Sequence, residues 1–151
     1  MTIEQKLRDD LKTAMRERDD MRKTTIRLTL AALKNAQVAK NAALTEDEEI
    51  AVLSRETKQL RDAIVEFERG KRGDLVAEST AQIEILQEYL PQALSEQEVI
   101  ELARAAIAET GAATPKQMGQ VMRVLMPQVR GRADGKAVSQ IVSALLAGRE
   151  G

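Results

Sequence analysis

The sequence contains no cysteine and no histidine among its 151 residues. Without cysteine the chain can form neither a disulfide nor a thiolate metal site, and it has no thiol nucleophile. Without histidine it lacks the commonest general base, and only carboxylates are left as ligands for zinc. From these two absences we expect no catalytic residue, no metal site and no cofactor.

Aromatic residues are also scarce, with one phenylalanine, one tyrosine and no tryptophan. A core built from Leu, Ile, Val, Met and Ala favours packed helices, because β-sandwiches draw on β-branched and aromatic residues. No apolar run approaches the ~20 residues needed to span a bilayer, and the charged start lacks the apolar segment of a secretory signal. We therefore expect a soluble, cytoplasmic, all-α protein with no membrane partner.

The charges are unevenly distributed, although the net charge is only −1. Residues 1–43 carry ten basic and six acidic side chains, residues 44–99 carry six and fourteen, and residues 100–151 carry seven and four. A local basic surface can attract polyanions even on an acidic protein. Solvated helical faces show the same kind of segregation, so the charge pattern alone leaves both interpretations open.

Apolar residues recur every three or four positions along the chain, which predicts helices over about residues 2–18, 20–40, 45–69, 74–90, 95–110, 114–127 and 135–147. The pattern leaves open whether the first two are continuous through Asp19 and Asp20. Their predicted core positions are Ile3, Leu7, Leu11 and Met15, then Ile26, Leu30, Leu33 and Val38. Asp74 is expected to cap the fourth helix. The expected stops are glycines or prolines, namely Gly70, Pro91, Gly111, Pro127 and Gly148.

Proline 91 divides this pattern into two parts, because proline disfavours a helical residue before it and cannot donate to the helical ladder. Four helices precede it, and three shorter ones follow. We therefore predict an N-terminal helical bundle over residues 1–90, a hinge at 91–95, and a compact C-terminal three-helix domain over 96–151.

The stretch RGRADGK, residues 130–136, is the most distinctive local pattern. It is not a nucleotide-binding P-loop, because its glycines are too close together, alanine follows Lys136, and the preceding segment is helical. The residues of the predicted turn are Gly131, Asp134 and Gly135, with Asp134 capping the last helix. The surrounding cations favour contact with an anion, while a purely structural turn explains the same residues. Both interpretations stay open at this point.

The carboxylates suggest salt-bridged faces rather than a metal centre. Glu84 and Glu88 are four residues apart on a predicted helix, but a carboxylate-bridged metal bundle also needs Glu-x-x-His ligands. No serine–lysine or glycine-rich serine motif is present either. An autonomous enzyme is therefore the least favoured of the functions considered.

Four stretches resemble the GatB/YqeY family in the same order and spacing: GKRGDL (70–75), IEILQEYLP (83–91), MGQVMRVLMP (118–127) and GRADGKAVSQIV (131–142). The resemblance covers essentially the whole chain and implies an N-terminal helical bundle with a C-terminal three-helix domain. The same domain forms the tail of GatB, a subunit of the glutamine-dependent tRNA amidotransferase, where it helps to grip tRNA. The family label of carbon–nitrogen ligase with glutamine as amido-N-donor belongs to catalytic parts that this chain is too short to contain.

The resemblance and the basic C-terminal segment lead to our first hypothesis, an accessory module that contacts tRNA or a tRNA–enzyme complex. Scarce aromatic residues argue against base stacking and sequence-specific readout. The expected phosphate contacts are Lys116, Arg123, Arg130, Arg132 and Lys136. The alternative is a protein-interaction module that docks onto a partner helix through an apolar groove, which Met118, Met122 and Leu125 would line if exposed.

Overall fold

The computed structural model describes residues 1–150, and of Arg149 and Glu150 only the backbone; Gly151, the last residue of the predicted C-terminal domain, lies outside the described residues. Residues 1–150 form seven α-helices and one short 3-10 helix, without any strand. The all-α prediction is confirmed. The chain divides into two compact units, one ending at Leu90 and the other beginning at Pro91.

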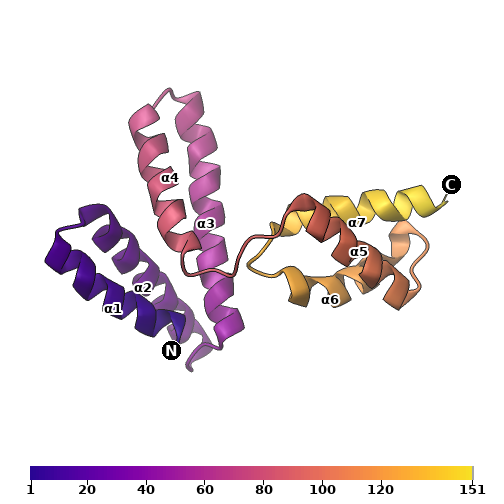
Figure 1. Ribbon diagram of the computed structural model, residues 1–151, viewed down its shortest axis with the longest axis horizontal. Helices are drawn as coiled ribbons and strands as arrows, with labels where there is room; N and C mark the ends of the chain where they lie inside the picture. The colour runs from indigo at the N-terminus through magenta and orange to yellow at the C-terminus, as the bar shows by residue number, and fades with distance from the viewer. Residues whose placement is uncertain (151) are drawn as a thin grey trace. The chain divides into compact units, whose positions relative to one another are not determined.

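The N-terminal unit contains four helices, α1 (Ile3–Glu17), α2 (Asp20–Lys40), α3 (Glu46–Arg69) and α4 (Gly73–Gln87). Helix α1 packs on α2, and α3 packs on α4, as two antiparallel hairpins (Figure 1). Helix α2 also contacts both α3 and α4, and α1 contacts α3. The aliphatic core of the unit therefore lies between the two hairpins.

Left-handed caps separate the first helices. Arg18 ends α1 with φ 58°, and Asn41 ends α2 with φ 59°. Asp19 then caps α2 by accepting a hydrogen bond from the N–H of Arg22 at 3.1 Å. Helices α1 and α2 are therefore distinct, because a left-handed residue turns the chain out of the right-handed ladder.

Two predicted core residues of this unit are exposed instead. Met15 is 51% exposed, while its neighbour Ala14 is completely buried; Val38 is 68% exposed. Residues spaced four apart drift about 40° around a helix at each step, so the run from Ile3 leaves the core by Met15. Val38 follows Leu33 by five residues, which also carries it off the buried side.

The connection between α3 and α4 differs from the prediction at both ends. The left-handed residue is Lys71, with φ 57°, whereas Gly70 has φ −80°. Helix α4 begins at Gly73 without a side-chain cap, so Asp74 lies in its first turn. Its carboxylate accepts two hydrogen bonds from Arg72, at 3.1 and 3.0 Å, which occupy the oxygens that a cap would need.

Polar contacts also join the helices of the N-terminal unit. Arg22 on α2 donates to both carboxylate oxygens of Glu88, just after α4, at 2.6 and 3.1 Å. The hydroxyl of Tyr89 donates to Asp10 on α1. Buried Glu49 on α3 accepts a hydrogen bond at 3.0 Å from the backbone N–H of Glu4, at the start of α1. These bonds tie all four helices together.

The C-terminal unit consists of α5 (Glu96–Thr110), the 3-10 helix η1 (Pro115–Gln117), α6 (Met118–Val129) and α7 (Gly135–Glu150). Helix α5 contacts both α6 and α7, and α6 contacts α7 (Figure 1). The residues between the helices include fully buried valines and leucines, with no polar group among the core members. This small unit is therefore held mainly by aliphatic packing.

Two predicted helix stops in this unit are wrong. Pro127 lies inside α6, and α7 runs through Gly148 to Glu150. Only two residues of α6 follow Pro127, so the proline removes a single ladder bond, to the carbonyl of Arg123, close to the helix end. Glycine at 148 can remain helical because it merely lowers helix propensity.

Candidate nucleic-acid interface

The candidate interface is built on η1 and α6, whose start is set by a short local motif. The Oε1 atom of Gln117 accepts hydrogen bonds from the backbone N–H of Ala113 at 2.7 Å and of Thr114 at 3.2 Å. Proline 115 occupies the first helical position, where its ring presets φ and its missing N–H costs nothing. Because η1 passes directly into α6, Lys116 belongs to the same helical surface.

One side of α6 is buried in the core of the C-terminal unit. Val121, Leu125 and Val129 are completely buried, and Met118 and Met122 pack partly buried against the same core. Leu125 therefore contacts its own unit and is not available to line the apolar groove predicted with Met118 and Met122.

The opposite side of η1 and α6 carries cations. Lys116 in η1, Arg123 in α6 and Arg130 at the C-cap of α6 are exposed and follow one another at intervals of seven residues. Two α-helical turns span about seven residues and roughly 10 Å, so this spacing sets the three cations along the same side of the segment. No aspartate or glutamate occurs anywhere in residues 111–133. The three cations consequently form a row that nearby carboxylates on the same segment do not neutralise.

The turn after α6 combines a left-handed glycine with a capped helix start. Gly131 has φ 75°, and the N–H groups of Arg132 and Ala133 donate to the carbonyl of Val129 at 2.8 and 3.0 Å. Asp134 accepts a hydrogen bond from the N–H of Ala137 at 3.3 Å, as an N-cap does. Gly135 needs no special conformation: its φ is not positive, and an added Cβ would meet only the Cε of Met126, at 3.9 Å.

Lys136 lies exposed in the first turn of α7, just beyond this turn. A cation at a helix N-terminus is disfavoured by the helix dipole, typically by ~0.3–1 kcal/mol. Helix stability therefore does not explain why a lysine occupies position 136. Within the part of the chain whose side chains are described, Lys136 forms no ion pair, and neither do Lys116, Arg123 and Arg130.

Arg132 differs from the other four predicted contacts because it is bound to its own unit. Its Nε donates to the carbonyl of Gln92 at 3.1 Å, and its own carbonyl accepts from the N–H of Leu94 at 2.7 Å. Its side chain is half-buried. Arg132 therefore holds residues 92–94, within the predicted hinge, against the start of α7, a role that sequence reasoning missed because the two segments lie 40 residues apart.

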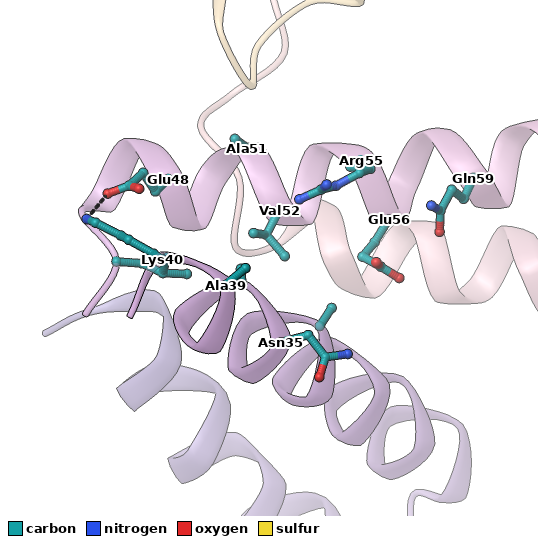
Figure 2. Close-up of a pocket in the computed structure, with 12 residues that line it drawn as sticks. Asn35, Ala39, Lys40, Glu48, Ala51, Val52, Arg55, Glu56 and Gln59 are labelled. Atoms are coloured by element: carbon teal, nitrogen blue, oxygen red, sulfur yellow. Dashed lines mark hydrogen bonds and ion pairs between the residues drawn. The ribbon is translucent and has the colours of Figure 1, made fainter. Parts of the chain in front are cut away.

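A groove of about 650 Å³ lies between α2 and α3 in the N-terminal unit (Figure 2). Four alanines help to line it, and their small side chains leave the space open. The Nζ of Lys40 and a carboxylate oxygen of Glu48 form an ion pair at 2.5 Å at one end (Figure 2). The hydrogen bond from Lys40 lowers the pKa of Glu48 to about 2, helped by bonds to Thr45. Sequence reasoning missed this groove, because alanines are simply good helix formers.

The part of the chain that the structure describes shows neither a metal-binding cluster nor a membrane-spanning helix. No group of three or more acidic side chains there is placed to hold a metal ion. No described helix combines the length and apolar character needed to cross a bilayer.

Known proteins with similar sequences include fungal relatives named "Altered inheritance of mitochondria protein 41, mitochondrial". The one from Pyrenophora tritici-repentis is 31% identical over 146 residues, which cover 93% of this chain and 79% of the relative. Those from Saccharomyces cerevisiae (strain YJM789) and Lachancea thermotolerans are 39% and 41% identical over 87 residues, 57% of this chain. The matched segment spans only about half of these two relatives, 47% and 46%.

These names contradict the cytoplasmic location expected from the sequence, since the relatives are mitochondrial proteins. The expectation was wrong because the absence of an apolar signal argues only against secretion; mitochondrial targeting segments are amphipathic rather than apolar.

The family comparison supports the resemblance seen in the four sequence stretches. The model of the family described as "Yqey-like protein" matches residues 4–146, which include both helical units and the complete basic row of η1 and α6. The chain therefore belongs to the Yqey-like family.

Proposed function

We propose that this chain is an accessory module that contacts RNA through Lys116, Arg123, Arg130 and Lys136, here called the basic face. The partner is tRNA or a tRNA–enzyme complex, as the resemblance to the tRNA-gripping tail of GatB suggests. The observation that carries the proposal is that these four exposed cations form no ion pair among the described side chains, and that three of them lie in residues 111–133, which contain no carboxylate.

The chemistry of the basic face fits a polyanion better than a single small anion. Lys116 and Arg130 lie roughly 20 Å apart along the helix, too far to hold one phosphate between them. Each cation can instead neutralise a separate phosphate and release counterions, which is the main source of affinity for nucleic acids. Because the side chains are exposed and form no ion pair with any described side chain, binding would break none of the ion pairs seen in the structure.

We assign Arg132 a supporting role within this interface, since its Nε already donates to Gln92. We further propose that the chain acts by binding rather than by catalysis, because it has neither histidine nor cysteine as base or nucleophile. Amidation would then be carried out by a partner.

The test is a fourfold substitution of the basic face, Lys116→Gln, Arg123→Gln, Arg130→Gln and Lys136→Gln. We expect affinity for tRNA, measured by fluorescence anisotropy at low salt, to fall at least about tenfold, a loss of ~1.4 kcal/mol of binding free energy. The helical circular dichroism should be unchanged, because all four side chains point into solvent.

A control variant with the same change in charge distinguishes loss of the basic face from a general effect of lowering the protein's positive charge. Lys12, Lys34, Arg16 and Arg61 are also exposed and form no ion pair among the described side chains, but lie in the N-terminal unit. Replacing these four residues by glutamine should leave most of the tRNA affinity unchanged. Equal losses in the two variants would contradict an RNA interface on α6.

A further inference from the structure

Gly119 is an exposed glycine in the first turn of α6, on the same side as the cations. It follows Lys116 by three residues and precedes Arg123 by four, so it lies between them on the surface. Its φ is not positive, and a Cβ added to it would meet no atom within 4 Å. Neither the backbone conformation nor packing within the unit requires glycine here, although alanine would favour the helix by up to ~1 kcal/mol.

A missing side chain at this place leaves the helix backbone open to a close-lying partner. Glycine is the residue found where a backbone and a ligand approach each other closely. The flanking cations identify the chemistry of that partner as anionic. Gln120, exposed beside Gly119, adds a neutral amide that can bond a ribose 2′-hydroxyl.

The C-terminal unit also lacks the residues that hold single strands. Residues 91–151 contain no phenylalanine, tyrosine or tryptophan, so bases splayed out of a single strand would find no aromatic ring to stack on. Three of the cations, Lys116, Arg123 and Arg130, stand instead at intervals of seven residues along the continuous segment of η1, α6 and its C-cap. A duplex presents its phosphates in an equally rigid and regular array, whereas a flexible strand must first be ordered.

We infer that the basic face binds the sugar–phosphate backbone of double-stranded RNA in preference to single-stranded RNA, and that this backbone passes closest to the protein at Gly119. The inference rests on the proposed function and names the RNA class that this face takes. Recognition is then by shape and charge, without reading the base sequence.

The first test compares two labelled RNAs of equal length, a 20-base-pair duplex and an unstructured oligouridylate, by fluorescence anisotropy with the full chain. We expect the duplex to bind at least about tenfold more tightly, which corresponds to ~1.4 kcal/mol. Equal affinities, or tighter binding of the oligouridylate, would overturn the duplex preference while leaving RNA binding in place. Binding of neither RNA would overturn the proposed function as well.

The second test fills the open position with Gly119→Ala and Gly119→Gln. We expect progressive loss of duplex affinity, reaching about tenfold for glutamine, together with an equal or higher melting temperature, because both residues favour the helix over glycine. Gly148→Gln is the matched control: Gly148 is also exposed and helical, with nothing within 4 Å of an added Cβ. Unchanged duplex affinity in Gly119→Gln, or the same loss in Gly148→Gln, would overturn the close approach at Gly119.

Discussion

The two units treat their charged side chains in opposite ways. Every ion pair found among the described side chains joins residues between Glu4 and Glu88, and none joins two side chains after Pro91. In the N-terminal unit, charges fasten one helix to another, as Arg22 does with Glu88. In the C-terminal unit, aliphatic packing holds the helices, and Lys116, Arg123, Arg130 and Lys136 lie exposed to solvent.

The comparison shows that a segment's net charge is a poor guide to where a polyanion can bind. Residues 1–43 have a larger excess of basic side chains than residues 100–151. Helix α1, however, interleaves its cations with four carboxylates, whereas α6 contains none. What matters for an RNA contact is the presence of cations without neighbouring anions, which is a property of residues 111–133.

The largest expected effect tests whether the two cores are separate. Leu125 and Leu53 are both completely buried, each packed only within the core cluster of its own unit. Replacing either by alanine should lower the free energy of unfolding by ~3 kcal/mol, through lost burial and the cavity left behind. Residue-resolved amide hydrogen exchange should show faster exchange mainly after Pro91 for Leu125→Ala, and mainly before Pro91 for Leu53→Ala.

The same hydrogen-exchange measurement can contradict the prediction that the two cores are separate. If amide exchange became faster along the whole chain in both variants, the two units would unfold together as one cooperative structure.

A smaller effect is expected at the turn that carries the basic face. Gly131 has φ 75°, so Gly131→Ala should destabilise the protein by ~1–2 kcal/mol, because a Cβ in the left-handed region meets the following carbonyl. Gly135→Ala is the control and should change stability little, since Gly135 begins α7 with φ in the ordinary range. Thermal unfolding measures both. Equal losses would show that the glycines share one requirement that the backbone does not reveal.

The smallest effect concerns the ion pair that links α2 to the end of α4. Arg22 and Glu88 are partly solvent-exposed, 30% and 53% by side chain, so a double-mutant cycle with Arg22→Gln and Glu88→Gln should give a coupling of only ~0.5–1 kcal/mol. The hydrogen bond from Arg22 lowers the pKa of Glu88 from its ordinary 4.5.

The lowered pKa sets the pH dependence of that pair. A carboxyl whose pKa is lower in the folded state stabilises the protein above the unfolded value, and this contribution disappears as the pH falls through the folded value. The destabilisation caused by Glu88→Gln should therefore be present at pH 7, shrink as the pH falls below 4.5, and vanish once the folded-state carboxyl is protonated. A coupling that persisted in acid would show that the contact does not depend on the charge of Glu88.

Helix positions could be predicted well from the sequence, because apolar periodicity and capping boxes act locally. Thr45-x-x-Glu48 and Ser95-x-x-Glu98 have the sequence pattern of a capping box. In the structure Thr45 and Ser95 accept hydrogen bonds from the backbone N–H of Glu48 at 3.2 Å and of Glu98 at 3.1 Å. The errors at Met15 and Gly148 arise where a small angular drift or one extra helical turn decides the outcome, and the error at Gly70 arises because the left-handed conformation falls one residue later, on Lys71. Local patterns do not contain that information.

The candidate site could be predicted only in part, for a similar reason. The sequence shows which cations are present, and helical spacing places Lys116 and Arg123 on one face. It could not show that Arg132 bonds to Gln92, since that pairing depends on how a distant segment folds back onto α7. Nor could it show that Gly119 faces open solvent, because a glycine in a helix can equally serve the close approach of another backbone.

The central claim, that the unpaired cations of the C-terminal unit bind RNA phosphates, is tested most directly by the salt dependence of tRNA affinity. Each phosphate contact contributes about 0.7 to 0.9 to the slope of log affinity against log salt concentration. The fourfold variant of Lys116, Arg123, Arg130 and Lys136 should therefore have a slope flatter by roughly three than the unchanged chain. The fourfold control variant in the N-terminal unit should keep the original slope. A slope unchanged by removing the basic face would contradict the account.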